Sequence, residues 1–322
     1  MDILERYRAE IVSVLAATVP EEGILRQLIG YPLGLVEADG TIGPGLGGKL
    51  LRPSLVLFVC EALGGDVHDA LPLAAAIELV HTFSLVHDDI VDGDRVRRGR
   101  PTAWVALGEH QAIHAGDGLL SLAFHTVAQG DLPGKMAARA VEALASATLA
   151  MVEGQARDLE LEGRPAGTEE YLEMARGKTG ALLGCALELG AISAWRPDLA
   201  SPHRAAGVAL GVAFQVRDDW LGLWGEPDAF GKAVGADLAR GKRSFPIVWA
   251  LERDPSLATL LREETPGRAR ARLAELGADR ASADEAERLL ALAEEQAGGL
   301  PWPGWATAAF GDLCRGLAAR VR

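Results

Sequence analysis

Residues 79–92 read LVHTFSLVHDDIVD, an apolar run that ends in three aspartates. The apolar residues recur at helical spacing, so the stretch predicts a helix with acidic side chains at its end. On a helix of about 3.6 residues per turn, His81, Asp88 and Asp92 project within a narrow arc, and the two aspartates lie one turn apart. The preceding residues are too apolar for a solvated surface, which makes this helix end a candidate functional site.

A second acidic pair, Asp218 and Asp219, ends a similar apolar run about 130 residues later. Carboxylates one helical turn apart repel each other, by roughly a few tenths of a kcal/mol in water and by more in apolar surroundings. A bound cation removes this repulsion. Monodentate carboxylates suit Mg²⁺, which prefers one or two protein carboxylates, several waters and the oxygens of a substrate phosphate. The two acidic helix ends therefore predict a Mg²⁺ site with a diphosphate as the substrate.

The composition favours an all-α protein. Of the 322 residues, 49% are hydrophobic and only 5% are aromatic, and apolar residues recur mostly at helical rather than alternating spacing. We expect one domain over residues 1–322, with more polar C-terminal helices over 263–322. The net charge of −13 argues against a nucleic-acid or anionic-membrane surface, because such surfaces need clustered Lys and Arg.

Glycine and proline divide the helical patterns from one another. The patterns run approximately over residues 2–18, 22–36, 48–64, 69–92, 103–129, 134–162, 168–194, 201–224, 236–252, 256–276, 281–298 and 304–321.

The cysteines indicate a reducing compartment. Cys60, Cys185 and Cys314 lie far apart in apolar helical stretches, so we expect buried reduced thiols and a cytoplasmic protein. The N-terminus opens an amphipathic helix rather than a signal peptide. No uncharged stretch is long enough to cross a bilayer, so we expect no integral membrane span.

Cationic residues stand near the first acidic cluster in the sequence. Lys49 and Arg52 lie three residues apart at the start of a predicted helix, where free backbone N–H groups also favour an anion. Residues 95–100 read RVRRGR and follow the aspartates directly. These arginines are candidates for bidentate binding of phosphate oxygens, and the alternative is a solvated loop.

Polar residues also interrupt the later apolar helices. Residues 154–158 read GQARD and residues 177–180 read GKTG, with Lys178 and Thr179 at the centre of the second motif. Gln215 falls on the same helix face as Asp218 and Asp219, where its amide can steady a water or a phosphate. A segment punctuated by glycine and suited to a closing flap then carries Lys232, Asp237, Lys242 and Arg243.

Taken in order from Gly47 to Pro246, these motifs resemble those of trans-polyprenyl (isoprenyl) diphosphate synthases, and most closely the geranylgeranyl diphosphate synthases. The matching elements are GGKLLRP, DDIVD followed by RRG, GQARD, KT, FQVRDD and the late lysines. The resemblance implies the all-α isoprenoid synthase fold, a helical bundle around a deep central cavity. It also implies that the two aspartate-rich helices face each other across that cavity, usually within a homodimer.

The resemblance also implies residue roles. Asp88, Asp92 and Asp218 would bind Mg²⁺ that bridges to the allylic diphosphate, supported by Asp89, Asp219 and, more distantly, Asp158. The same allylic diphosphate would be held by Arg97, Lys178, Thr179, Gln215, Lys232 and Lys242. A separate pocket for the diphosphate of isopentenyl diphosphate would be formed by Lys49, Arg52, His81 and Arg98.

The implied reaction is a Mg²⁺-dependent head-to-tail (1'-4) condensation of isopentenyl diphosphate with an allylic prenyl diphosphate. Cationic groups neutralise charge on the departing diphosphate, and the resulting allylic cation is attacked by the double bond of isopentenyl diphosphate. Phe83 stands five residues before Asp88, and the smaller Ser84 stands one turn before it. The resemblance links an aromatic residue at that place to a C20 product, geranylgeranyl diphosphate, with a C15 farnesyl or a C25 or longer product as the alternatives.

The chain departs from the family pattern at two positions. Leu50 stands where the family commonly has Arg, and Gly222 replaces the last aspartate of the second cluster.

A class I terpene cyclase would use the same metal cage, but it would not need a second anion pocket. A non-enzymatic regulatory subunit would keep the fold but show damaged motifs, whereas the chemical positions here are filled.

Overall fold

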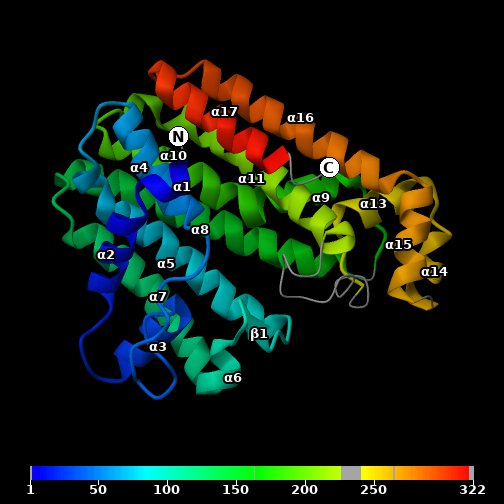
Figure 1. Cartoon of the computed structure of the whole chain (residues 1–322), viewed down its shortest axis with the longest axis horizontal. Helices are drawn as coiled ribbons and strands as arrows, with labels where there is room; N and C mark the ends of the chain where they lie inside the picture. The colour runs from blue at the N-terminus through cyan, green and yellow to red at the C-terminus, as the bar shows by residue number, and fades with distance from the viewer. Residues whose placement is uncertain (1, 163, 226–240, 264, 319–322) are drawn as a thin grey trace. The chain divides into compact units, whose positions relative to one another are not determined.

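The computed structural model describes residues 2–162, 164–225, 241–263 and 265–318 (Figure 1). These residues are mostly helical and contain almost no strand, which confirms the all-α prediction. Their strands are β1 (Val96–Arg97) and β2 (Arg100–Pro101), which pair antiparallel in one short hairpin. The chain divides into two compact units. Unit 1 comprises Met1–Ala145 and Ala186–Ala200, and unit 2 comprises Ser146–Cys185 and Ser201–Arg322.

Helix α5 (Val67–Val91) is the central helix of unit 1. It packs against α2 (Arg8–Thr18), α4 (Leu51–Ala62) and α7 (Glu109–Gln129). A helix that is apolar nearly all round must be surrounded in this way, and Leu73, Ile77 and Leu79 are fully buried. The N-cap Asp66 accepts a hydrogen bond from the His68 backbone N–H at 2.9 Å.

Helix α5 is also the element to compare with the prediction that the chain has no membrane span. Among the described residues it is the one helix long and apolar enough to cross a membrane by length and composition alone. In its most apolar window, 67% of the residues are buried inside the protein. This burial is typical of a core helix.

The remaining elements of unit 1 flank this core. They are α1 (Ile3–Arg6), α3 (Ile24–Leu33), α6 (Ala103–Leu107), η2 (Pro197–Leu199), the first part of α8 (Gly134–Leu161) and the second half of α10 (Ala181–Ser193). The helix predicted over 2–18 is interrupted at Tyr7, and the one predicted over 103–129 is interrupted at Gly108. Gly108 has a φ of 93°, a conformation that only glycine adopts readily and that ends a helix.

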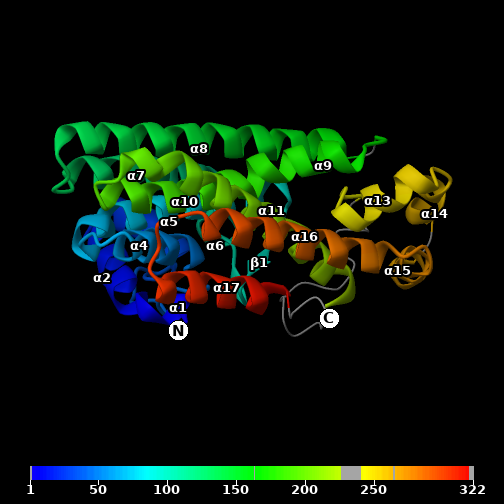
Figure 2. The same cartoon turned by 90° about the horizontal axis from the view of Figure 1, so that it is seen from above.

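Unit 2 contains the later helices. They are α9 (Thr168–Ala175), the π-helical turn η1 (Arg176–Gly180), α11 (Ala200–Trp224), α13 (Phe245–Arg253), α14 (Leu257–Glu263), α15 (Pro266–Glu275), α16 (Ala278–Gly298) and α17 (Gly304–Ala318). Helices α16 and α17 lie side by side in both views (Figures 1 and 2). Helix α13 packs against α9 and α16. Leu223, Ile247, Leu257 and Leu273 form a buried cluster that joins α11, α13, α14 and α15.

The cysteine prediction is confirmed. Cys60, Cys185 and Cys314 are buried free thiols. Burial raises the pKa of the Cys60 thiol to about 11 and that of the Cys314 thiol to about 12. Because the thiolate is the reactive form, burial leaves both groups inert at neutral pH.

Candidate functional site

The first acidic cluster lies at the C-terminal end of α5. The backbone N–H of Asp92 donates to the carbonyl of Asp88 at 2.8 Å, so the two residues stay one helical turn apart at the helix end. Both residues are half-buried. The C-terminus of a helix carries partial negative charge, which adds to the repulsion between the two carboxylates. The helix end therefore favours a bound cation more strongly than charge spacing alone predicts.

The donor set at this end fits Mg²⁺. Asp88 and Asp92 offer hard carboxylate oxygens and no thiolate, the ligand chemistry that Mg²⁺ prefers. No group of three or more His, Cys, Asp or Glu side chains that could hold a metal ion occurs among the described residues. A preformed protein cage is not what Mg²⁺ needs, since waters and substrate phosphates complete its shell.

Asp89 has a different environment from its neighbours. It is 4% exposed, and its Oδ1 accepts from Arg97 Nε and Arg97 Nη2, both at 2.7 Å. Burial raises the pKa of Asp89, and the hydrogen bond from Arg97 opposes that rise. Asp89 therefore anchors Arg97, a predicted ligand of the allylic diphosphate, to the end of α5.

The hairpin β1–β2 presents the next arginine. Arg98 and Gly99 form its tip with φ values of 52° and 75°, the pattern of a two-residue type I′ turn. Left-handed backbone costs a residue with a Cβ about 1–2 kcal/mol. The base of the hairpin is held at the carbonyl of Asp94, which accepts from Thr102 Oγ1 at 2.8 Å and Trp104 Nε1 at 2.7 Å. The fold thus keeps a strained Arg98 at the tip.

The four arginines of residues 95–100 divide into two groups. Arg95 stacks on the Trp104 ring with its guanidinium carbon 5.3 Å from the ring centroid. Arg100 stacks on the Tyr31 ring at 4.6 Å and pairs with Glu37 at 3.0 Å. The contacts of Arg95 and Arg100 are structural, which leaves Arg97 and Arg98 as the candidates for the predicted phosphate-binding role.

Three of the residues predicted to form the isopentenyl site, Arg52, His81 and Arg98, interact electrostatically in unit 1. Burial, followed by the positive charges of Arg52, Arg98 and Arg97, holds the pKa of His81 well below its usual value. The imidazole is therefore neutral and surrounded by cations. Gly48, next to Lys49, has a φ of 85°, and a Cβ there would lie 2.7 Å from Arg98 Nη2. The missing side chain lets the Arg98 guanidinium lie over this backbone.

Glu78 belongs to the same cluster and was missed from the sequence. It is 6% exposed and lies one turn before His81 on α5. Burial raises the pKa of Glu78, while the charges of Arg52 and Arg98 lower it. The available signal was a lone glutamate inside the apolar run of α5. Leu50, where the family commonly has Arg, is 3% exposed and has a φ of 49°.

The second acidic cluster lies on α11 in unit 2. Gln215 Nε2 donates to Asp219 Oδ1 at 2.9 Å, and Thr179 Oγ1 donates to Gln215 Oε1 at 2.5 Å. The predicted sharing of a helix face by Gln215 and Asp219 is confirmed. Asp218 is half-buried, with its Oδ1 3.6 Å from Arg217 Nη2.

Tyr171 was not predicted to be part of this cluster. Its hydroxyl donates to Asp219 Oδ2 at 2.6 Å, and the backbone N–H of Phe245 donates to the same oxygen at 2.9 Å. Burial, then the charge of Asp219, raises the pKa of Tyr171 well above its usual value. Nothing in the spacing of residues 168–175 marks this tyrosine, because its partner is 48 residues away.

Two lysines in the described part of unit 2 converge on one carboxylate. Lys178 Nζ donates to Asp158 Oδ2, and Lys242 Nζ lies 3.9 Å from the same oxygen. A Cβ on Gly154, one turn before Asp158, would lie 2.1 Å from the backbone N of Lys178. The glycine therefore permits the contact between α8 and the π-helical turn η1 that sets this ion pair. π-Helical turns often occur at functional sites.

The structure places the two predicted chain-length residues on α5. Phe83 is 8% exposed, and its ring lies edge-on to the His87 ring with centroids 4.9 Å apart. Ser84 Oγ donates to the carbonyl of His81 at 2.7 Å. Lys232 and Asp237 lie outside the described residues.

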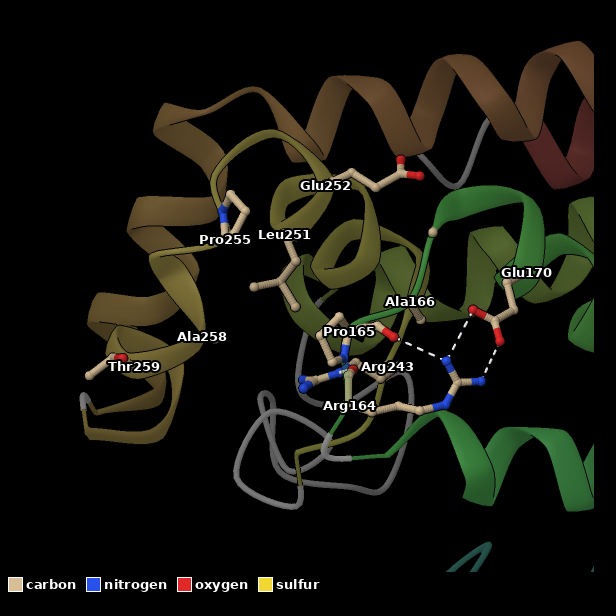
Figure 3. Close-up of a pocket in the computed structure, with 11 residues that line it drawn as sticks. Arg164, Pro165, Ala166, Glu170, Arg243, Leu251, Glu252, Pro255, Ala258 and Thr259 are labelled. Carbon is tan, nitrogen blue, oxygen red and sulfur yellow. Dashed lines mark hydrogen bonds and ion pairs between the residues drawn. The ribbon is translucent and has the colours of Figure 1, made fainter.

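A separate cavity of about 520 Å³ lies in unit 2 (Figure 3). Arg164 pairs with Glu170 at its wall, and Arg243 Nε donates to the carbonyl of Arg164 at 3.0 Å. Glu252 accepts from the backbone N–H and the hydroxyl of Thr168, both at 2.9 Å. None of the residues predicted for substrate or metal binding lines this cavity.

Comparisons with known proteins agree with the resemblance drawn from the motifs. The family model described as Polyprenyl synthetase matches residues 43–275. A geranylgeranyl diphosphate synthase of Mycobacterium tuberculosis is 44% identical over 263 residues, 80% of this chain and 75% of that protein. A (2E,6E)-farnesyl diphosphate synthase of Mycobacterium bovis is 40% identical over 286 residues, 86% of this chain and 75% of that protein.

A solved structure gives the same result. The crystal structure of a polyprenyl synthetase from Streptomyces coelicolor A3(2) is similar with a TM-score of 0.90 at 36% sequence identity. The match covers 98% of this chain and 98% of that one.

Proposed function

The chain belongs to the polyprenyl synthetase family of prenyltransferases, and we propose that it condenses isopentenyl diphosphate with an allylic prenyl diphosphate in a Mg²⁺-dependent, head-to-tail reaction. The observation that carries the proposal is found on α5. Its end presents Asp88 and Asp92, while His81, two turns earlier, lies among arginines. Two chemically different anion sites, one acidic and metal-binding and the other cationic, suit two diphosphate substrates.

Asp88, Asp92 and Asp218 are the proposed Mg²⁺ ligands, with Asp89 and Asp219 in support. Bound Mg²⁺ would neutralise charge on the departing diphosphate. The chain's own cations would bind and orient that group. Arg97 is held for this purpose by Asp89, and Lys178 by Asp158. Removal of water from this site would protect the allylic cation, since water would quench it.

The second substrate is proposed to bind at Lys49, Arg52, His81 and Arg98. Three of these residues carry full positive charge, while His81 is neutral because its pKa is depressed. A neutral imidazole contributes a neutral donor and avoids a further positive charge among the arginines. The buried carboxylate of Glu78 limits the excess positive charge of this cluster before a diphosphate binds.

We propose geranylgeranyl diphosphate, C20, as the product. The buried Phe83 on α5 and the 44% identity to a geranylgeranyl diphosphate synthase support this length. The 40% identity to a farnesyl diphosphate synthase keeps C15 as the alternative, and C25 or longer remains a further one. If the Phe83 ring forms the floor of the product site, Phe83→Ala should lengthen the product. An unchanged product spectrum by mass spectrometry removes Phe83 from that role.

Four further proposals concern the domain, the assembly, the location and Lys232. The family match at 43–275 includes residues of both units, so we propose that residues 1–322 act as a single polyprenyl synthase domain. A homodimer and a cytoplasmic location are also proposed, with the family resemblance and the buried free thiols as their support. Lys232, outside the described residues, is proposed to help hold the allylic diphosphate.

Incubation of the purified protein with Mg²⁺, labelled isopentenyl diphosphate and dimethylallyl, geranyl or farnesyl diphosphate tests the reaction. We expect label in a longer prenyl diphosphate. A label-free hydrocarbon would instead identify a class I terpene cyclase, and the absence of any turnover would favour a regulatory subunit. The same incubation reads the product length by chromatography.

A further inference from the structure

Asp219 is the centre of a hydrogen-bond network in unit 2. Its Oδ1 accepts from Gln215 Nε2 at 2.9 Å. Its Oδ2 accepts from the hydroxyl of Tyr171 at 2.6 Å and from the backbone N–H of Phe245 at 2.9 Å. The donors come from α9, α11 and α13, so one carboxylate links three helices of this unit.

Tyr171 is built rigidly into this network. It is fully buried, and its ring lies edge-on to the Phe245 ring with centroids 5.5 Å apart. A buried phenol must find a partner for its hydroxyl, and here the partner is a carboxylate at short range. Tyr171 also precedes Lys178 on the continuous run of α9 and η1. Tyr171 is therefore linked to two predicted substrate ligands, to Gln215 through Asp219 and to Lys178 through the helix.

The network decides which way the Gln215 amide faces. A carboxylate only accepts hydrogen bonds, so Asp219 requires the amide nitrogen on its side. The amide oxygen then faces Thr179, whose hydroxyl donates to it. The second N–H of Gln215 Nε2 can then donate a hydrogen bond in a fixed direction. Because the Thr179 hydroxyl donates its hydrogen to Gln215, the contribution of Thr179 is to orient that amide.

We propose that Tyr171 is a positioning residue for the allylic substrate. Together with the Phe245 N–H it fixes Asp219, and Asp219 in turn fixes the Gln215 amide that binds the allylic diphosphate. Asp219 serves as a hydrogen-bond hub, and the metal-binding contribution of this cluster rests on Asp218. The inference rests on the proposed function, because it assigns Gln215 to a substrate of that reaction.

Tyr171→Phe removes one oxygen atom and tests this role. A hydrogen bond to a charged group is worth roughly a ten- to hundredfold factor. We expect kcat/KM for the allylic substrate to fall by about that factor, and the KM for isopentenyl diphosphate to stay within about twofold. Binding of an allylic thiolodiphosphate, which does not ionise, should weaken in parallel when measured by calorimetry with Mg²⁺.

Tyr7→Phe is the matched control. Tyr7 is 4% exposed, and its hydroxyl donates to Glu61 at 2.5 Å, so this variant also loses a tyrosine–carboxylate hydrogen bond. Both variants should lower the unfolding temperature of the metal-free protein. Only Tyr171→Phe should change the kinetics and the binding of the thiolodiphosphate. Wild-type kinetics and binding in Tyr171→Phe would overturn the inference.

A double-mutant cycle tests the route through Gln215. Tyr171→Phe combined with Gln215→Leu should be no worse than Gln215→Leu alone, because the tyrosine acts through that amide. Independent, multiplying losses would overturn the inference. Asp219→Asn keeps the side-chain shape and should reproduce the Tyr171→Phe signature, which provides a second route if that variant folds poorly. Absence of label incorporation by the wild-type protein would instead count against the proposed function, and the comparison of thiolodiphosphate binding would still test Tyr171.

Discussion

At the scale of single residues, Arg98 holds a backbone conformation that its residue type disfavours. Its φ of 52° puts it in the left-handed region at the tip of the hairpin β1–β2. Backbone strain of this kind persists where the surrounding structure enforces it, and it clusters at functional sites. The guanidinium lies over Gly48, beside Lys49. The strained backbone of Arg98 therefore lowers the stability of this turn while it holds the Arg98 guanidinium in place.

Arg98→Asn should separate stability from binding. Asn-Gly is the preferred pair in a type I′ turn, so we expect the free energy of unfolding in urea to rise by about 0.5–1 kcal/mol. The KM for isopentenyl diphosphate should rise at least about tenfold, since a charge-assisted contact is lost. Arg95→Ala, which removes an arginine stacked on Trp104, should leave that KM within about twofold. A less stable Arg98→Asn protein with wild-type KM would contradict this account.

His81 gives a pH dependence of stability. Its pKa is depressed in the folded protein, so below about pH 6.5 the unfolded chain binds a proton that the folded chain does not. The contribution of His81 to stability is therefore complete above pH 6.5 and is lost as the pH falls toward the folded pKa. The expected slope is at most about 1.4 kcal/mol per pH unit. In His81→Gln, urea unfolding between pH 6.5 and 5 should show a smaller loss of unfolding free energy, and an identical profile would argue against a neutral imidazole in the folded protein.

At the scale of elements, the sequence predicted the helices well because glycine, proline and apolar spacing act locally. It missed the break in the helix at Tyr7. No local sequence pattern marks this break, and the contact that the Tyr7 hydroxyl makes is with Glu61 on α4, far away in the sequence. It also missed the π-helical turn η1 inside the helix predicted over 168–194. That turn depends on the backbone contact with α8 at Gly154, a long-range cause that no local pattern records.

The contact at Gly154 leads to a prediction for this pair of elements. In Gly154→Ala the added methyl group would lie 2.1 Å from the Lys178 backbone N, so α8 and η1 must separate. We expect a loss of about 1–3 kcal/mol in unfolding free energy and a fall in kcat as Lys178 shifts from Asp158. Gly316→Ala in α17 is the control, because nothing lies within 4 Å of its added Cβ. That substitution should stabilise the protein by about 0.5–1 kcal/mol in the same urea titration. Equal stability and kcat in the two variants would show that the α8–η1 contact is not critical.

At the scale of the whole molecule, the sequence predicted the chemistry of the candidate site but not the side chains that contact its predicted residues. Asp88, Asp92, Gln215 and Asp219 were predicted as site residues because acidic or amide groups at helical spacing form a local pattern. Glu78 and Tyr171 were not found, since their importance comes from partners distant in sequence. The pairing of Arg97 with Asp89 and of Lys178 with Asp158 likewise depends on the folded structure and has no local sequence signal.

We propose that the aspartates of both clusters contribute to Mg²⁺-dependent binding of the allylic diphosphate. Calorimetric titration of an allylic thiolodiphosphate into the wild-type, Asp88→Ala and Asp218→Ala proteins, with and without Mg²⁺, tests that claim most directly. We predict that the wild-type protein binds tightly only with Mg²⁺ and that each substitution weakens binding by at least about 100-fold. Equally tight binding without Mg²⁺, or in either variant, would contradict it.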